Sequence, residues 1–232
     1  MTSQKDALNA GNEPSADRHE SSADRLEPST DRRESSTHRL GSSVDRREFV
    51  SRLLSALPHA LVVTGLGSAS YDVFAAGDRD ENFYLWGAMG GAASMGLGLA
   101  LAQPDRSVVV ITGDGEQLMG IGSLATIAAK QPRNLTLVVL DNGHFGETGM
   151  QRSHTSLGTD LVAVAKGFGI TGAMTADSLE HCGAIAEQIT ARQGTGFVQV
   201  RVRADEPPRA LPPRDGSYVK NRFRATLGLK PF

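Results

Sequence analysis

The chain has 232 residues, of which 39% are hydrophobic, and its formal net charge is −2. This length suits one folded domain with flanking tails, and the near-neutral charge gives no reason to expect nucleic acid or an anionic membrane as a partner. No apolar run reaches the roughly 18 residues that a membrane span requires, and the polar N-terminus does not resemble a signal peptide. The single Cys182 fits a reducing, cytoplasmic location and argues against an iron–sulfur cluster.

The chain begins with a polar repeat. Residues 15–49 form five tandem heptads, from SADRHES to SVDRREF, but apolar residues are missing from the positions that would form a coiled-coil seam. Because nothing is buried to offset chain entropy, we predict a disordered arm over residues 1–42. A solvated repeat without a specific role is favoured over a partner-binding arm. The last heptad runs into DRREFVSRLLSAL, whose apolar residues share one helical face, and there the folded domain is expected to begin.

From residue 43 onward the pattern alternates between strand and helix. Such repeated βα units predict the α/β class, with a single doubly wound parallel sheet and helices on both faces over residues 43–204. Residues 205–232 begin with a stretch that contains Pro207, Pro208, Pro212 and Pro213, and they are expected to form a strap on a neighbouring surface. The expected elements are the strand ALVVTG and a helix from Ser68, the strand NFYLW and a helix from Gly90, the strand SVVVIT and a helix from Glu116, the strand LTLVVL, a helix from about Thr159, a short strand near Ile170, a helix from about Ser178 and the strand FVQVRV.

Two polar turns carry the strongest functional signal. Asp114 lies between two glycines directly after SVVVIT, and Asp141-Asn142 comes at the end of LTLVVL. Two parallel strands joined by a crossover helix bring both turns to the same sheet edge, where open α/β sheets bind ligands. Asp114 and Asn142 therefore offer two hard oxygen ligands to one divalent cation, and Mg²⁺ typically completes such a shell with phosphate oxygens. We interpret the pair as a diphosphate site that works through a metal; two unrelated turns are the alternative.

This GDG followed by a spaced DNG resembles the signature of thiamine diphosphate enzymes, in which the second motif is an Asn pair. Asp141 stands where the first Asn of that pair would be. The resemblance implies thiamine diphosphate and Mg²⁺ as cofactors. It implies as metal ligands the Asp114 carboxylate, the Asn142 side-chain oxygen and the main-chain carbonyl of His144.

The resemblance extends to the groups around the cofactor. By resemblance, the Gly87 carbonyl accepts a hydrogen bond from the 4′-amino group of the aminopyrimidine, and Met89 wedges beneath the bend between the two rings, which favours an internal proton transfer. The alternative for the segment around Gly87 and Met89 is that its small residues only allow a helix to pack closely on the sheet. Gly87, Met89 and His144 are the catalytic candidates. The expected cofactor-binding residues are Thr64, Gly87, Ala88, Met89, Gly113, Asp114, Gly115, Glu116, Asn142, His144, Phe145 and Gly146, among which the N–H groups of Gly115 and Glu116 would face the diphosphate.

The loop after the second turn narrows the resemblance. LDNGHFGETGMQ, together with TDLVAVAKGFG, is similar to the sulfopyruvate and phosphonopyruvate decarboxylases, over about residues 45–203. A cationic Arg152 would suit an anionic sulfonate or phosphonate. The candidates for substrate contact are His144, Glu147, Gln151, Arg152 and His154, each of which has a surface role as its alternative.

A competing prediction comes from the turn TGLGSAS. It follows a strand, opens a helix and partly matches the G-x-G-x-x-G of nicotinamide dinucleotide sites, with Asp80 and Glu81 farther on. Ser70 replaces the third glycine, however, and the fingerprint would leave the GDG and DNG turns unexplained. We therefore expect this turn to lie near substrate or cofactor, with Thr64 and Ser68 as hydrogen-bond donors.

Enzymes of this family build the active site between two domain types, and the second, pyrimidine-binding domain supplies a glutamate. The polar arm cannot form that domain, so we expect a separate partner subunit and a hetero-oligomer, such as two copies of each chain. The expected function is the thiamine diphosphate- and Mg²⁺-binding subunit of a decarboxylase (a lyase) that converts a small 2-oxo acid into an aldehyde and CO₂. A carboligase subunit and a non-catalytic regulatory subunit are the alternatives.

Overall fold

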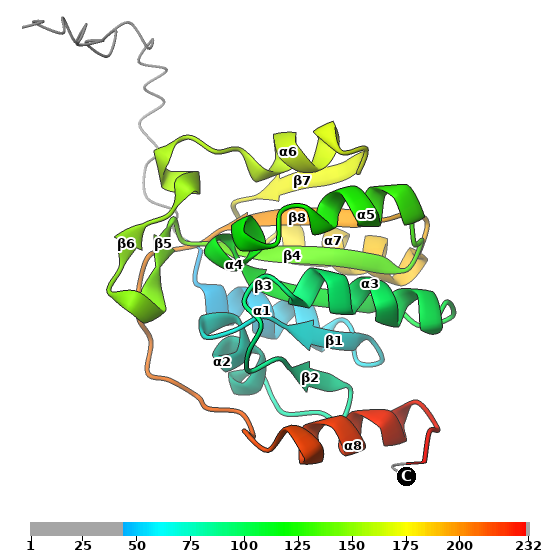
Figure 1. Cartoon of the computed structure of the whole chain (residues 1–232). Coiled ribbons are helices and arrows are strands. Elements are labelled where there is room, and N and C mark those ends of the chain that lie inside the picture. Colours follow the sequence, from blue (N-terminus) through cyan, green and yellow to red (C-terminus); the bar gives the residue numbers. More distant parts are fainter. Residues whose placement is uncertain (1–43, 231–232) are drawn as a thin grey trace, which may run out of the picture. The chain divides into compact units, whose positions relative to one another are not determined.

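The computed structural model describes residues 44–230, so the predicted disordered arm lies outside the described residues (Figure 1). A six-stranded sheet runs through this part of the chain in the order β2-β1-β3-β4-β8-β7, and each neighbouring pair is parallel. The predicted α/β class with one parallel sheet is confirmed. The strands are β1 (Leu61–Thr64), β2 (Asn82–Tyr84), β3 (Val108–Gly113), β4 (Leu135–Asp141), β7 (Gly172–Ala176) and β8 (Gly196–Arg201).

Helices cover both faces of this sheet, which explains the near-continuous apolar runs of its strands. Every residue of β4 is buried, and alternate residues of β3 contribute to two separate hydrophobic clusters. Val109 and Ile111 pack on one face, and Val108 and Val110 pack on the other. The first face is covered by α1 (Arg46–Ser55), α2 (Ser68–Ala75) and α7 (His181–Ala191), and the second by α3 (Ala92–Ala102), α5 (Ser123–Lys130) and α6 (Leu161–Gly167).

Several predicted helix boundaries differ from the structure for local reasons. The helix expected from Gly90 begins at Ala92, because Gly90 adopts a φ of +89° that a right-handed helix excludes. The helix expected from about Thr159 begins one residue after Asp160, whose side chain caps it by accepting a hydrogen bond from Ala163 N. The helix after β3 begins at its Asp rather than at Glu116, and it is two helices, α4 (Asp114–Met119) and α5, separated at Gly120.

Beyond β4 the chain forms a small hairpin that the sequence pattern did not predict. Strands β5 (His144–Phe145) and β6 (Gln151–Arg152) pair in antiparallel fashion around the 3₁₀ turn η1 (Gly146–Thr148), and the 3₁₀ turn η2 (His154–Leu157) follows. Figure 1 shows this hairpin at the carboxyl ends of the sheet strands. The loop expected to lie next to the second polar turn is thus an ordered two-stranded unit.

The described part of the C-terminal segment contains the helix α8 (Gly216–Thr226), which was also not predicted. Asp215 caps it by accepting hydrogen bonds from two backbone N–H groups, and Phe223 packs edge-on against Phe83 of β2 with ring centroids 5.5 Å apart. Farther upstream, the indole N–H of Trp86 donates to Pro213 O at 2.7 Å. The segment therefore lies against the edge strand of the sheet, whereas the domain boundaries at residues 43 and 204 stay predictions. In residues 44–230 no helix is long and apolar enough to cross a membrane.

Candidate functional site

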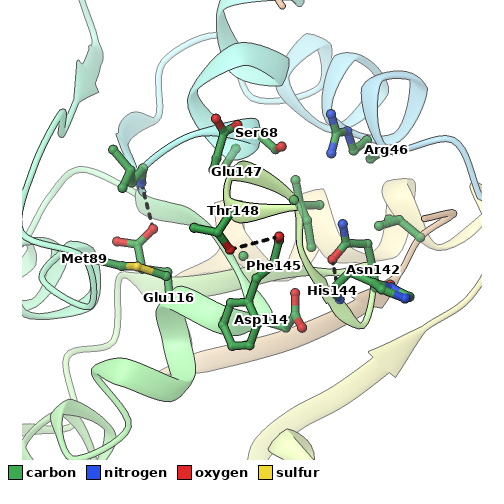
Figure 2. A pocket seen from close by; sticks show the side chains of 17 residues that line it. Arg46, Ser68, Met89, Asp114, Glu116, Asn142, His144, Phe145, Glu147 and Thr148 are labelled. Carbon is green, nitrogen blue, oxygen red and sulfur yellow. Dashed lines mark hydrogen bonds between the residues drawn. The ribbon is translucent and has the colours of Figure 1, made fainter. Parts of the chain in front are cut away.

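A cavity of about 160 Å³ lies at the carboxyl ends of β3 and β4 (Figure 2). The register explains why the two polar turns meet there, because Gly113, the last residue of β3, pairs with Leu140 of β4. The next residues of both strands, Asp114 and Asp141, therefore lie side by side. Of the expected cofactor-binding residues, the cavity wall contains Met89, Gly113, Asp114, Gly115, Glu116, Asn142, His144, Phe145 and Gly146.

Asp114 is the first residue of α4, and its side chain is held from the hairpin side. The residue is 2% exposed. Its Oδ2 accepts hydrogen bonds from the hydroxyls of Ser153 and Thr155, the latter at 3.2 Å. Burial, and after it the neighbouring Asp141 carboxylate, raise the pKa of Asp114 to about 6. A divalent cation beside this carboxylate would favour its charged form.

Asp141 stands where the family motif has an Asn, and its carboxylate accepts hydrogen bonds from other groups of the protein. Its Oδ1 accepts hydrogen bonds from Gly143 N at 2.9 Å and from Thr155 Oγ1 at 2.7 Å, and its Oδ2 accepts one from Gln199 Nε2 at 2.5 Å. The single hydroxyl proton of Thr155 cannot be donated to both Asp141 and Asp114 at once. Two buried carboxylates with too few donors between them are an arrangement that a cation or a shared proton would relieve.

The second turn folds back on itself. Asn142 Oδ1 accepts a hydrogen bond from His144 N at 3.0 Å, and the His144 ring Nδ1 lies 2.8 Å from Asn142 O. Gly143 between them has a φ of +70°, which favours glycine. Among the described residues no three His, Cys, Asp or Glu side chains cluster as a metal site. The expected ligand set of one carboxylate, one amide oxygen and one main-chain carbonyl is of a different kind, and its roles stay predictions.

Glu116 contributes its carboxylate as well as its backbone to the wall. The side chain is buried, and its Oε2 accepts a hydrogen bond from Leu66 N at 2.7 Å, which ties α4 to the turn after β1. A Cβ on Gly65 would lie only 1.8 Å from Oε2, so any other residue at that position would displace the Glu116 carboxylate. Burial raises the pKa of Glu116. Of the two donors expected from this turn, Ser68 lines the cavity, whereas the buried Thr64 hydroxyl pairs with Ser70 Oγ at 2.6 Å.

The turn between β2 and α3 brings Met89 to the cavity. Ala88 has a φ of +55°, and its carbonyl accepts a hydrogen bond from Gly91 N at 2.7 Å, which closes the turn. Met89 lines the cavity and is 39% exposed, while Gly87 and Ala88 lie outside the cavity wall. Figure 2 shows Met89 near Glu116 and on the opposite side of the cavity from Asn142.

The turn that carries Met89 packs against the end of α4 through a close contact between Gly90 and Gly120, and this contact can be tested. A Cβ on Gly120 would lie 2.2 Å from Gly90 O, although the Gly120 φ of −98° suits any residue. We expect Gly120→Ala to displace the turn that carries Met89 and to lower the free energy of unfolding by about 1–3 kcal/mol. Gly122→Ala is the matched control, because its Cβ would meet nothing within 4 Å, and it should change that free energy by less than about 0.5 kcal/mol. Urea denaturation measures both; equal midpoints would contradict the packing argument.

The candidates for substrate contact divide into two groups. His144 and Glu147 line the cavity, and Glu147 also forms an ion pair of 3.1 Å with Arg209 of the C-terminal segment. Arg152, expected as the cation for an anionic substrate, is exposed and donates to Ser156 instead. Neither Gln151 nor His154 is on the cavity wall.

Three residues at the site were missed by the sequence interpretation. Ser153 and Thr155 hold Asp114, and Arg46, at the start of α1, lines the cavity. The hydroxyls of Ser153 and Thr155 lie in a polar loop. Arg46 precedes by almost a hundred residues the turn of Asn142 and His144, here named the metal turn after the ligands expected in it, so no local motif marked these three residues. The nearest available signal for Arg46 was the Arg pair after Asp45.

Comparison with known proteins places this geometry in context. The family model described as "Thiamine pyrophosphate enzyme, C-terminal TPP binding domain" matches residues 69–200. A phosphonopyruvate decarboxylase of Streptomyces viridochromogenes is 40% identical over 188 residues, which are 78% of this chain and 46% of that protein. A sulfopyruvate decarboxylase subunit beta of Methanothermobacter thermautotrophicus is 38% identical over 176 residues, which are 76% of this chain and 91% of that protein. The chain thus spans about half of the first relative and most of the second.

A solved structure supports the same fold. The thiamine diphosphate-dependent 4-hydroxybenzoylformate decarboxylase of Rhodococcus jostii RHA1 superposes with a TM-score of 0.61 at 20% sequence identity. The match covers 72% of this chain and 34% of that chain. At this identity the likeness concerns the arrangement of the strands and helices alone.

Proposed function

The chain belongs to the thiamine pyrophosphate enzyme family through its C-terminal TPP-binding domain, and we propose that it is the thiamine diphosphate- and Mg²⁺-binding subunit of a 2-oxo acid decarboxylase. The observation that carries the proposal is that Asp114 and Asn142 line one cavity at the carboxyl edge of the sheet. The reaction would release CO₂ from a small 2-oxo acid, of the sulfopyruvate or phosphonopyruvate kind, and give an aldehyde.

The donor groups at the cavity suit a magnesium diphosphate. A carboxylate, an amide oxygen and a main-chain carbonyl are hard oxygen ligands of the kind that Mg²⁺ takes, and the crowding of Asp114 against Asp141 is the arrangement that a cation relieves. In the proposal Asp114, Asn142 and the His144 carbonyl hold the metal. Ser153 and Thr155 orient the Asp114 carboxylate through their hydroxyls.

The remaining residues would position the reacting groups. When bound, thiamine diphosphate supplies a nucleophilic carbon and an electron sink for decarboxylation. The Gly87 carbonyl would accept a hydrogen bond from the aminopyrimidine, and Met89 would support the bend between the rings from its side of the cavity. Glu116 would keep the turn after β1 in place through Leu66 N, and Phe145, whose ring packs against Gly115, would exclude water from the start of α4.

A partner chain is part of the proposal. Met95 and Leu101 of α3 and Met119 of α4 are exposed apolar side chains that a partner chain would cover. One of the relatives is named as a beta subunit. We therefore propose a hetero-oligomer in which a separate subunit supplies the pyrimidine-binding domain, for example with two copies of each chain.

The state of the single cysteine supports a cytoplasmic location. Cys182 is a buried free thiol, and burial raises its pKa. A lone buried thiol can form no disulfide within the chain, and it cannot supply the several cysteines that an iron–sulfur cluster requires. The proposed chemistry therefore uses no cluster in this chain.

Cofactor binding tests the proposal directly. Trp86, the single tryptophan, immediately precedes the turn that carries Gly87 and Met89, so its fluorescence should report binding. We expect thiamine diphosphate to change the emission in the presence of Mg²⁺ and to lose that effect in excess EDTA. Thiamine without phosphates should bind far more weakly under both conditions. Binding that is equally tight with and without the divalent ion would contradict the assignment of Asp114 and Asn142.

Product analysis would separate decarboxylation from carboligation. The assembled enzyme should release free aldehyde from the 2-oxo acid, and an added acceptor aldehyde should not divert the product. The relatives are named as decarboxylases, which is why we prefer this outcome. Formation of a hydroxyketone or hydroxyacid adduct as the main product would instead support the carboligase alternative.

A further inference from the structure

A buried arginine faces the cavity from a helix that carries none of the predicted site residues. Arg46 is the first residue of α1 and is only 6% exposed. It lines the 160 Å³ cavity and also an adjoining cavity of about 230 Å³ in front of the C-terminal segment. Figure 2 shows Arg46 on the same side of the cavity as Asn142 and across it from Met89, and both Arg46 and Asn142 line the two cavities. Its cationic group thus lies at the metal-turn end of the cavity.

The pairing of Arg46 within the protein is incomplete. Its Nε lies 3.0 Å from Oδ2 of the fully buried Asp72 but without the alignment of a hydrogen bond. The adjacent Arg47 does donate a hydrogen bond, from its Nε to Asp72 Oδ1 at 3.1 Å, and also donates to Pro208 O. Among the residues that the structure describes, the two terminal nitrogens of Arg46 have no hydrogen-bond partner.

The charges around Arg46 do not balance locally. One carboxylate, Asp72, faces two guanidinium groups, and the nearby acid Asp45 forms its ion pair with Arg203. A buried cation without a full partner is costly, so such a group usually meets a ligand or a counter-ion. At the proposed metal site, a single divalent ion cannot neutralise both a diphosphate and the Asp114 carboxylate. An oxyanion between the metal turn and Arg46 would satisfy both sides.

We propose that Arg46 binds a tetrahedral oxyanion at the metal-turn end of the cavity. The planar guanidinium can donate two parallel hydrogen bonds to phosphate, phosphonate or sulfonate oxygens. Two ligands share this chemistry: the terminal phosphate of the cofactor and the anionic group of the substrate. This inference rests on the proposed function, and it transfers the role of anion ligand from the exposed Arg152 to Arg46.

The chain offers a closely matched pair of variants. Arg46→Gln and Arg47→Gln each remove one positive charge and one contact with Asp72, but Arg47 is absent from the walls of both cavities. Melting temperatures would show that both variants fold. Isothermal titration calorimetry with the full chain would then use two probes, inorganic pyrophosphate with Mg²⁺, and sulfoacetate added to protein that is already loaded with thiamine diphosphate and Mg²⁺.

We expect Arg46→Gln to weaken binding of at least one probe by about tenfold or more, as for a lost hydrogen bond between charged groups, while Arg47→Gln binds like the parent. Loss with pyrophosphate identifies the cofactor phosphate as the ligand, and loss with sulfoacetate alone identifies the substrate anion. The inference is overturned if Arg46→Gln binds both probes as the parent does, or if Arg47→Gln weakens them equally. A parent chain that does not bind pyrophosphate with Mg²⁺ would overturn the proposed function itself.

Discussion

Replacing Asp114 by asparagine is expected to weaken the Mg²⁺-dependent binding of thiamine diphosphate by about 100-fold or more. Groups that only orient a metal ligand already contribute 10- to 100-fold, and the Asp114 carboxylate is the one charged group in the expected ligand set. The variant should keep its fold, because an amide oxygen can still accept hydrogen bonds from the Ser153 and Thr155 hydroxyls. Fluorescence titration of Trp86 measures the binding.

The same substitution weakens cofactor binding but should stabilise the fold of the metal-free chain. Burial raises the pKa of Asp114 from its ordinary value of 3.8 to about 6, so the folded chain holds the proton more tightly than the unfolded chain does. The contribution of Asp114 to the free energy of unfolding therefore falls as pH rises from about 4 to about 6, and it stays lower above that range. Asparagine removes this loss, so at about pH 7 the metal-free variant should be more stable than the parent by roughly 1–3 kcal/mol.

Urea denaturation in EDTA at both ends of this pH range checks the prediction. Asp72 also has a pKa that burial raises to about 6, but its contribution is common to parent and variant and cancels in the difference. Asp177→Asn is a suitable control, since this exposed acid follows β7 at the same edge of the sheet. Two results together would show that Asp114 has a purely structural role. Without metal, the Asp114→Asn chain would be less stable than the parent at about pH 7, and with Mg²⁺ it would bind thiamine diphosphate as tightly as the parent does.

The purified chain by itself is expected to decarboxylate 2-oxo acids at least about 100-fold more slowly than the chain assembled with its partner. The family resemblance assigns an essential glutamate to the pyrimidine-binding domain, and a positioned acid typically contributes 10²- to 10⁴-fold. Three carboxylates line the cavity in the described residues: Asp114 contacts two hydroxyls, Glu147 pairs with Arg209, and Glu116 accepts from Leu66 N through Oε2 while its buried Oε1 has no hydrogen-bond partner.

Release of CO₂ from sulfopyruvate or phosphonopyruvate, with and without the co-purified partner, measures this dependence. Cofactor binding by the isolated chain serves as the control, because the metal and diphosphate ligands should all lie in this chain. A matched pair of variants tests whether the exposed side of α3 binds the partner. Leu101→Glu on α3 should reduce co-purification of the partner with this chain, whereas Leu229→Glu, which is similarly exposed, should not. Turnover by the single chain at the rate of the assembly would contradict the need for a partner.

Much of the fold was predictable from local patterns. Nearly continuous apolar runs such as SVVVIT and LTLVVL predicted buried parallel strands, and they are β3 and β4 in the structure. Elements whose apolar residues do not recur at the spacing of a helix or a strand were not predicted. The helix α8 is rich in charged residues and follows a proline-rich stretch, and it is held to the edge strand by the packing of Phe223 on Phe83 and by Arg222, which donates to Asn82 O and pairs with Asp78. The β5–β6 hairpin consists of two-residue strands, which are too short for any periodicity.

Asp114 and Asn142 could be placed at one edge of the sheet from the sequence, because parallel strands that follow one another through a crossover helix end on the same side. The groups that surround the two residues could not be predicted in this way, because they come together only through tertiary packing. Ser153 and Thr155 reach Asp114 from the start of η2, just after the hairpin, and Arg46 reaches the same cavity from the start of α1. These contacts join residues far apart in the chain, and they depend on how helices and loops pack across the sheet edge, which no local pattern of residues encodes.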